Sequence, residues 1–156
     1  MNSPTRLTLA LALALAGCKA TPPGRFERAV AAEVKRRVTV GGKSDRNPLV
    51  ATEENVGLGR KAFASYCMAC HGLDGQNTGV PFADAMSPPV PRLIDPEVQQ
   101  YTDGQLHWVI ENGLFPSGMP AARGILNDEE LWQLVLYIRH LPPPGSLGEP
   151  AMYSGG

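Results

Sequence analysis

The chain has 156 residues, 43% of them hydrophobic and 19% charged, which are ordinary values for one soluble globular domain. The formal net charge of −1 argues against a nucleic-acid partner, and three cysteines argue against a small fold held together by disulfides. The 17 glycines and 15 prolines predict much irregular backbone, but they are too few for a disordered low-complexity chain.

Residues 1–17 are typical of a bacterial export signal. The apolar run over residues 7–16 is too short for a membrane span, which needs about 20 residues, and fits the apolar region of a secretory signal. Residues 15–18, Leu-Ala-Gly-Cys, resemble a lipobox, and this resemblance implies that Cys18 is diacylated and becomes the mature N-terminus. Two or three acyl chains would anchor the protein stably. The alternative is a secreted protein with a free Cys18.

Residues 18–50 are predicted to form a lipidated N-terminus and a basic tether. Residues 24–50 carry seven basic and three acidic side chains, a charge of +4, whereas the chain from residue 51 onward carries −7. The tether is either a solvated spacer or a segment that binds to anionic lipid headgroups. We expect the folded domain to span residues 51–144 and a C-terminal tail to follow over residues 145–156.

Helix signals occur three times in this domain. The first helix is predicted over residues 53–67, with Thr52 as its N-cap. The second begins with a capping box formed by Thr102 and Gln105 and ends at Gly113, which suits a left-handed stop position.

The third helix is predicted from Asn127 to about residue 141. Its first turn holds three acidic residues, and three consecutive prolines follow its end. No convincing strand pattern occurs. About 30 residues between the first two helices are rich in Gly and Pro, and such a long loop needs something large to wrap around.

Residues 67–71, Cys-Met-Ala-Cys-His, form the attachment signature for c-type haem. The thiols of Cys67 and Cys70 can reach the two vinyl groups on one porphyrin edge, and the imidazole of His71 then lies over the iron. The alternatives are a redox-active dithiol or half of a zinc site. A thioredoxin-like dithiol would follow a strand, and a zinc site would need a second Cys or His pair, whereas His107 and His140 are single. We therefore predict one covalently bound haem c.

Residues 59–67 resemble the first helix of class I cytochromes c, which carries a Gly and an aromatic residue one turn apart before the haem motif. The resemblance covers about residues 53–141. It implies an all-α cytochrome c fold, with three main helices and long loops wrapped around one haem. In that family the first helix crosses the last at the Gly, beside an aromatic residue. The matching aromatic here is Tyr137, with Trp132 as second choice.

Iron that is bound by one His needs a sixth ligand or an open site. Met119 lies between the second and third helices, 48 residues after His71, and its Gly-Met-Pro context resembles the axial methionine loop of class I cytochromes. Met86 follows His71 by only 15 residues, which is short for reaching the opposite haem face. The resemblance thus implies His71 and Met119 as axial ligands, the alternative for Met119 being core filler or a surface residue.

The ligating His71 is expected to donate its other ring N–H to a carbonyl. In the family this acceptor is a proline carbonyl in the following loop. Pro81 is the first choice here, and Pro88, Pro89 and Pro91 are close rivals.

These features predict an electron carrier and not an enzyme. Two axial protein ligands leave no place for a small-molecule substrate. We expect single-electron transfer between membrane-associated or periplasmic redox proteins on the periplasmic side of a bacterial membrane, and a basic docking face on the partner. One alternative is a haem-bearing subunit of a larger dehydrogenase or terminal oxidase. Another is an enzyme or gas sensor, such as a peroxidase, with an open sixth site.

Overall fold

The structure is a computed structural model that describes residues 24–154. The predicted export signal and Cys18 lie outside the described residues. The chain divides into two units, Met1–Glu33 and Val34–Gly156. Among the described residues there are helices and no strand, and none of these helices has the length and apolarity that a membrane span requires.

The described N-terminal segment is helical where the sequence analysis predicted a tether. Helix α2 (Arg25–Val34) leads directly into a short π-helix, η1 (Lys35–Thr39). Its apolar side chains Phe26, Val30 and Val34 are all exposed. Helix α2 thus forms without burying these side chains.

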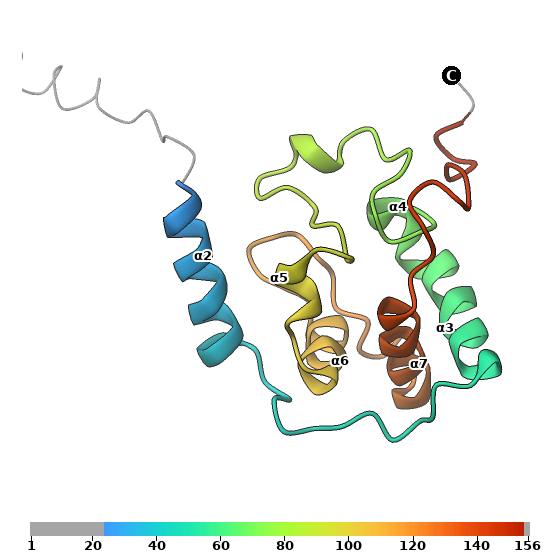
Figure 1. The fold of residues 1–156 in the computed structure, drawn as a ribbon, viewed down its shortest axis with the longest axis horizontal. Coiled ribbons are helices and arrows are strands. Elements are labelled where there is room, and N and C mark those ends of the chain that lie inside the picture. The colour runs from blue at the N-terminus through green and yellow to red at the C-terminus, as the bar shows by residue number, and fades with distance from the viewer. Residues whose placement is uncertain (1–23, 155–156) are drawn as a thin grey trace, which may run out of the picture. The chain divides into compact units, whose positions relative to one another are not determined.

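Three long helices organise the second unit: α3 (Glu53–Tyr66), α6 (Asp103–Asn112) and α7 (Asp128–Arg139) (Figure 1). The side-chain oxygen of Thr52 accepts a hydrogen bond from the third residue of α3, as the sequence predicts. Thr102 and Asn127 form capping boxes with Gln105 and Glu130, respectively. Each cap satisfies backbone amides that have no partner inside the helix. The three predicted helices and the all-α fold are confirmed.

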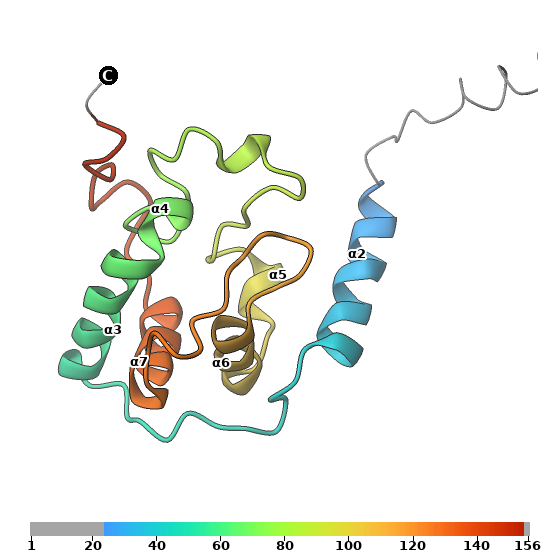
Figure 2. The ribbon, with the colours of Figure 1, turned by 180° about the vertical axis from the view of Figure 1, so that it is seen from behind.

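Short elements fill the connections: α4 (Met68–His71), the 3₁₀-helix η2 (Ala83–Ala85) and α5 (Pro96–Gln99). Figure 2 shows the long, mostly irregular stretch that leads from α4 to α5. A second loop joins α6 to α7 and contains two isolated bridges, between Leu114 and Met119 and between Arg123 and Leu126.

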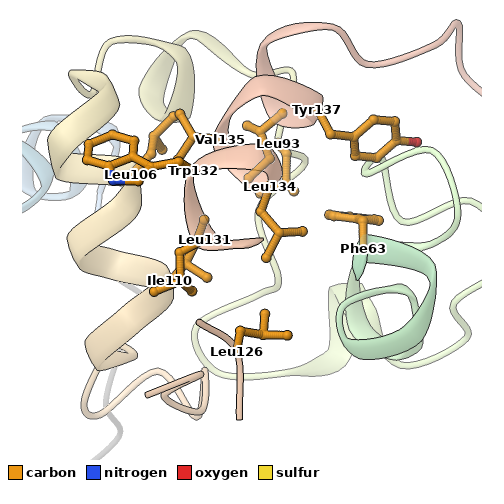
Figure 3. Packing of buried hydrophobic residues seen from close by; sticks show 11 residues of the cluster. Phe63, Leu93, Leu106, Ile110, Leu126, Leu131, Trp132, Leu134, Val135 and Tyr137 are labelled. Carbon is orange, nitrogen blue, oxygen red and sulfur yellow. The ribbon is translucent and has the colours of Figure 1, made fainter. Parts of the chain in front are cut away.

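Helix α7 is the centre of the core. Every residue from 131 to 138 is buried, and Leu134 and Val135 have no exposed surface. A helix that is buried on all sides must be covered by its neighbours. Helix α3 packs mainly against α7, and α6 packs against it as well. Figure 3 shows Phe63 reaching from α3 toward Leu134 and Tyr137.

Helices α3 and α7 touch at Gly59. A Cβ atom at this position would lie 2.0 Å from the carbonyl oxygen of Gln133 and 3.1 Å from the Cβ atom of Tyr137. One turn later, the rings of Phe63 and Tyr137 lie 5.1 Å apart at an interplanar angle of 58°. The expected crossing at the glycine is present, and the aromatic residue beside it is Tyr137 and not Trp132.

The second unit begins well before residue 51, the predicted start of the domain. Val40 is buried, and the side-chain amide of Asn47 donates a hydrogen bond to the carbonyl oxygen of Trp132 at 3.0 Å. Leu49 packs against the core cluster. In Figures 1 and 2, residues 40–52 run past the ends of α6 and α7 to reach α3. This strap therefore belongs to the domain, because long-range contacts hold it there.

We expect Gly59→Ala to destabilise the protein by about 3 kcal/mol, since the added methyl group forces two helix backbones apart. The measurement is urea unfolding of the haem-loaded protein, followed by helical circular dichroism. Gly57→Ala is the matched control, because nothing lies within 4 Å of a Cβ at Gly57 in the same helix. It should stabilise the protein by up to about 1 kcal/mol. Equal effects of the two substitutions would contradict the crossing.

Candidate haem-binding site

Helix α3 delivers the two cysteines to the site. The amide of Cys67 still donates to the carbonyl of Phe63, at 2.9 Å, and the amide of His71 donates to the carbonyl of Cys67, at 3.0 Å. The motif therefore continues the helical path with little interruption. The thiols of Cys67 and Cys70 are both free and partly buried. They remain available to form bonds with a ligand.

The Cys67 thiol does not have the acidity of a redox-active dithiol. Burial, and secondarily the neighbouring Cys70, raises the pKa of Cys67 to about 12. Catalytic C-x-x-C pairs instead lower the pKa of one thiol so that it reacts as a thiolate at neutral pH. This environment disfavours the dithiol alternative for the motif.

The imidazole of His71 is buried and incompletely satisfied. Its exposed fraction is 9%, and its Nδ1 atom is buried without a hydrogen-bond partner. Burial lowers the pKa of His71, and the backbone carbonyl of Pro91 opposes that shift. A lowered pKa keeps the imidazole neutral at pH 7, which is the form that binds a metal. The ring of Phe63 lies 6.4 Å from the imidazole.

Among the candidate prolines, the structure brings Pro91 to His71. The Pro91 carbonyl raises the pKa of the imidazole, although Nδ1 itself has no hydrogen-bond partner. Pro81, the first choice from the sequence, is exposed and lines a surface hollow together with Tyr153.

Met119 lies in a tight loop after α6. Its carbonyl accepts a hydrogen bond from the amide of Leu114 at 3.1 Å, and its side chain packs half-buried against the core cluster. Gly113 ends α6 with a φ of 70°, and a Cβ atom there would lie 2.6 Å from the Met119 carbonyl oxygen. Only glycine fits this position, so it determines how the loop leaves the helix.

Met86 lies nearer to this loop than sequence separation suggests. Its terminal methyl carbon would be 3.7 Å from a Cβ atom placed on Gly118, the neighbour of Met119. The side chain is half-buried. No local pattern in the sequence around Met86 indicates this contact. The contact depends on the path of the irregular loop that contains Met86, and neighbouring residues do not determine that path.

A buried carboxylate, Asp74, ties the loop after the motif to the C-terminal segment. Its Oδ1 atom accepts from the amide of Gln76 at 2.9 Å. Its Oδ2 atom accepts from the Thr78 hydroxyl at 2.6 Å and from the amide of Gly145 at 2.7 Å. Burial by itself would raise the pKa of Asp74, but these hydrogen bonds outweigh it and lower the pKa.

The C-terminal segment also contacts the haem motif directly. The Tyr153 hydroxyl donates to the carbonyl of Ala69, between the two cysteines, at 2.8 Å. Pro150 is fully buried, and the Tyr153 ring packs edge-on against Phe82 at 6.0 Å. We call residues 142–154 the C-terminal clasp. The described part of the predicted tail is thus an integral part of the domain, as its course beside α4 in Figure 1 illustrates.

Neither of the other histidines joins the motif. The ring of His107 stacks on Trp132 at 4.2 Å, and its Nε2 atom lies 2.9 Å from Asp128. The Nδ1 atom of His140 is 2.8 Å from the carbonyl oxygen of Leu136. Within residues 24–154, no group of three or more His, Cys, Asp or Glu side chains could hold a metal ion, so these residues form no zinc site of that kind.

The described residues fit a covalently attached haem. Two free thiols precede a buried imidazole with an unpaired ring nitrogen, and they lie at the end of a helix that crosses the last helix at a glycine. The fold and this site define a c-type cytochrome, a haem-bearing electron-transfer protein. Residues 54–138 match the family model for cytochrome c oxidase, cbb3-type, subunit III, and the chain belongs to this family. No curated protein matches the chain significantly. The C-terminal clasp lies outside the matched residues.

We expect Asp74→Asn to destabilise the protein by about 1–2 kcal/mol at neutral pH, because the amide group cannot accept all three hydrogen bonds. The folded-state pKa of Asp74 is lowered. Its contribution is therefore complete above the unfolded value of about 3.9 and is lost as the pH falls through the folded value.

Urea unfolding between pH 7 and pH 2 measures this effect. The difference between the original protein and the Asp74→Asn variant should shrink as the pH falls below about 4. Asp84→Asn, at an exposed position in η2, is the control and should leave the curve unchanged. A difference that stays constant down to pH 2 would show that the Asp74 charge has no role.

Proposed function

We propose that this protein is a mono-haem cytochrome that passes single electrons between redox proteins while a lipid at Cys18 holds it to the periplasmic side of a bacterial membrane. Cys67 and Cys70 form the thioether bonds, and His71 and Met119 are the axial ligands. The observation that carries the proposal is the placement of both free thiols beside a buried imidazole whose Nδ1 has no partner.

The haem, when bound, supplies a one-electron couple at its iron. The protein's own residues orient and shield the ligands. The Pro91 carbonyl acts on the pKa of His71 and is our candidate to accept its Nδ1–H, which would direct Nε2 toward the metal and raise the basicity of the ring. Phe63 covers the side of the imidazole that faces it. A half-buried thioether at Met119 would favour the reduced iron.

A second candidate function is suggested by the family to which the chain belongs. The family is described as subunit III of a cbb3-type cytochrome c oxidase. This description favours a haem-bearing subunit that relays electrons inside a larger complex. Purification from membranes solubilised in mild detergent separates the two functions, because a subunit would remain with its complex in fixed stoichiometry, whereas a free carrier would separate from its partners.

Met119→Ala should open the sixth position of the iron. We expect the original protein, in its reduced form, to bind carbon monoxide slowly or not at all, and the variant to bind it at once. The measurement is the absorption spectrum before and after addition of carbon monoxide, including the band from methionine to ferric iron. Prompt binding by the original protein would instead support a gas sensor or a peroxidase.

Met86→Ala is the matched control, since Met86 approaches the same loop. It should keep the methionine-to-iron band and the slow reaction with carbon monoxide. Loss of the band in Met86→Ala, together with its retention in Met119→Ala, would transfer the ligand role to Met86.

Salt should slow electron transfer to a partner that has a basic docking face. Residues 51–156 carry a charge of −7, and attraction between exposed charges is screened beyond about 8 Å at physiological ionic strength. The measurement is the second-order rate constant for oxidation of the reduced protein by a basic cytochrome, at increasing concentrations of sodium chloride. A rate that is independent of salt would indicate docking through apolar contacts.

A further inference from the structure

Helix α2 carries apolar side chains that the described structure leaves exposed. Phe26, Val30 and Val34 follow one another at intervals of four residues, and their exposed fractions are 81%, 47% and 52%. Residues spaced by four lie on one face of an α-helix, so the three side chains form a continuous stripe. We call this set the α2 stripe. An exposed stripe of this kind on a soluble domain marks a contact surface.

The charge of α2 and the adjoining η1 indicates the kind of surface that they contact. Residues 25–39 contain five basic and two acidic residues, a net charge of +3. Helix α2 itself has two basic and two acidic residues, so the excess positive charge lies in Lys35, Arg36 and Arg37 of η1. Apolar side chains combined with excess positive charge are the composition of helices that lie in the interface of an anionic bilayer. The chain from residue 51 onward carries a charge of −7, so the excess positive charge is confined to the residues before it.

The length of the preceding chain limits how far α2 can be from the membrane. Cys18, the proposed site of lipid attachment, precedes the first residue of α2 by seven positions. A fully extended chain of seven residues spans at most about 25 Å. Acylated Cys18 would therefore hold the start of α2 within that distance of the headgroups, whatever the conformation of the residues between them.

We propose that α2 lies in the headgroup region of an anionic bilayer, with the α2 stripe turned toward the acyl chains. This inference rests on the lipid anchor of the proposed function and adds a second point of attachment to it. The acyl chains provide the permanent membrane anchor. The α2 stripe and the basic residues make binding of the helix depend on the charge of the lipid surface.

Spin labels on the full-length, lipidated, haem-loaded protein test this arrangement. One label is attached at Val30→Cys, in the α2 stripe, and a second at Ala31→Cys, an exposed neighbour about 100° further around the helix. The protein is reconstituted into vesicles of phosphatidylglycerol and phosphatidylcholine, or of phosphatidylcholine alone. Electron paramagnetic resonance then compares collisions of each label with oxygen, which enters lipid, and with a water-soluble nickel complex.

In anionic vesicles we expect a severalfold higher ratio of oxygen to nickel collisions at Val30→Cys than at Ala31→Cys. In phosphatidylcholine vesicles the two ratios should become equal. Adding Phe26→Ser and Val34→Ser should remove the difference in anionic vesicles. The paired control, Val50→Ser and Ile125→Ser, alters exposed apolar residues outside α2 and should leave the difference intact.

Equal, water-like ratios at both labels in anionic vesicles would overturn the proposal. So would shielding of Val30→Cys that develops only after a redox partner protein is added, because the α2 stripe would then be a protein interface. The haem spectrum and the mass of the N-terminal peptide, measured on the same samples, report ligation and acylation independently. Failure of α2 to enter the bilayer is thus distinguishable from failure of the proposed function.

Discussion

The direct contact between α3 and α7 at Gly59 is the constraint on which the rest of the domain depends. Because position 59 lacks a side chain, the α3 backbone can lie against the carbonyl of Gln133. This approach places Phe63 5.1 Å from Tyr137 and 6.4 Å from the imidazole of His71. The haem motif continues directly from the last turn of α3. Any separation of the two helices would displace the motif, because no strand or disulfide among the described residues holds it.

The site is completed by segments that have little regular structure of their own. Asp74 accepts three hydrogen bonds and joins the loop after His71 to the C-terminal clasp. Tyr153 reaches the backbone between the two cysteines. Ordering an irregular loop costs about 1–2 kcal/mol of conformational entropy per residue, which these buried polar contacts and the porphyrin must offset together. The C-terminal clasp therefore helps to hold the haem motif in place.

Charge divides the chain into regions suited to different partners. In our two proposals, the basic residues near the N-terminus meet an anionic bilayer, whereas the acidic domain meets a basic redox protein. These attractions do not compete, because they act on opposite signs of charge. The net charge of the whole chain, −1, does not reveal this division.

Patterns within a few residues were sufficient to predict the haem motif, the three helices and their caps. A capping box at Thr102, or two thiols followed by an imidazole over residues 67–71, depends only on neighbours along the chain. The crossing at Gly59 was also predictable, but through resemblance to a family. The sequence alone therefore determined the chemistry of the site and the helices that carry it.

Tertiary structure decided which distant residues complete the site. In the folded protein, Pro91 and not Pro81 acts on His71, and Met86 lies next to the Met119 loop. Residues 40–50 and the C-terminal clasp are part of the domain. Apart from the Met86 contact, each of these contacts has a backbone carbonyl or amide as one partner, and because every residue has these groups, no residue type marks that partner in advance. Their positions follow from the path of long irregular loops, and that path is determined only when the whole core has packed.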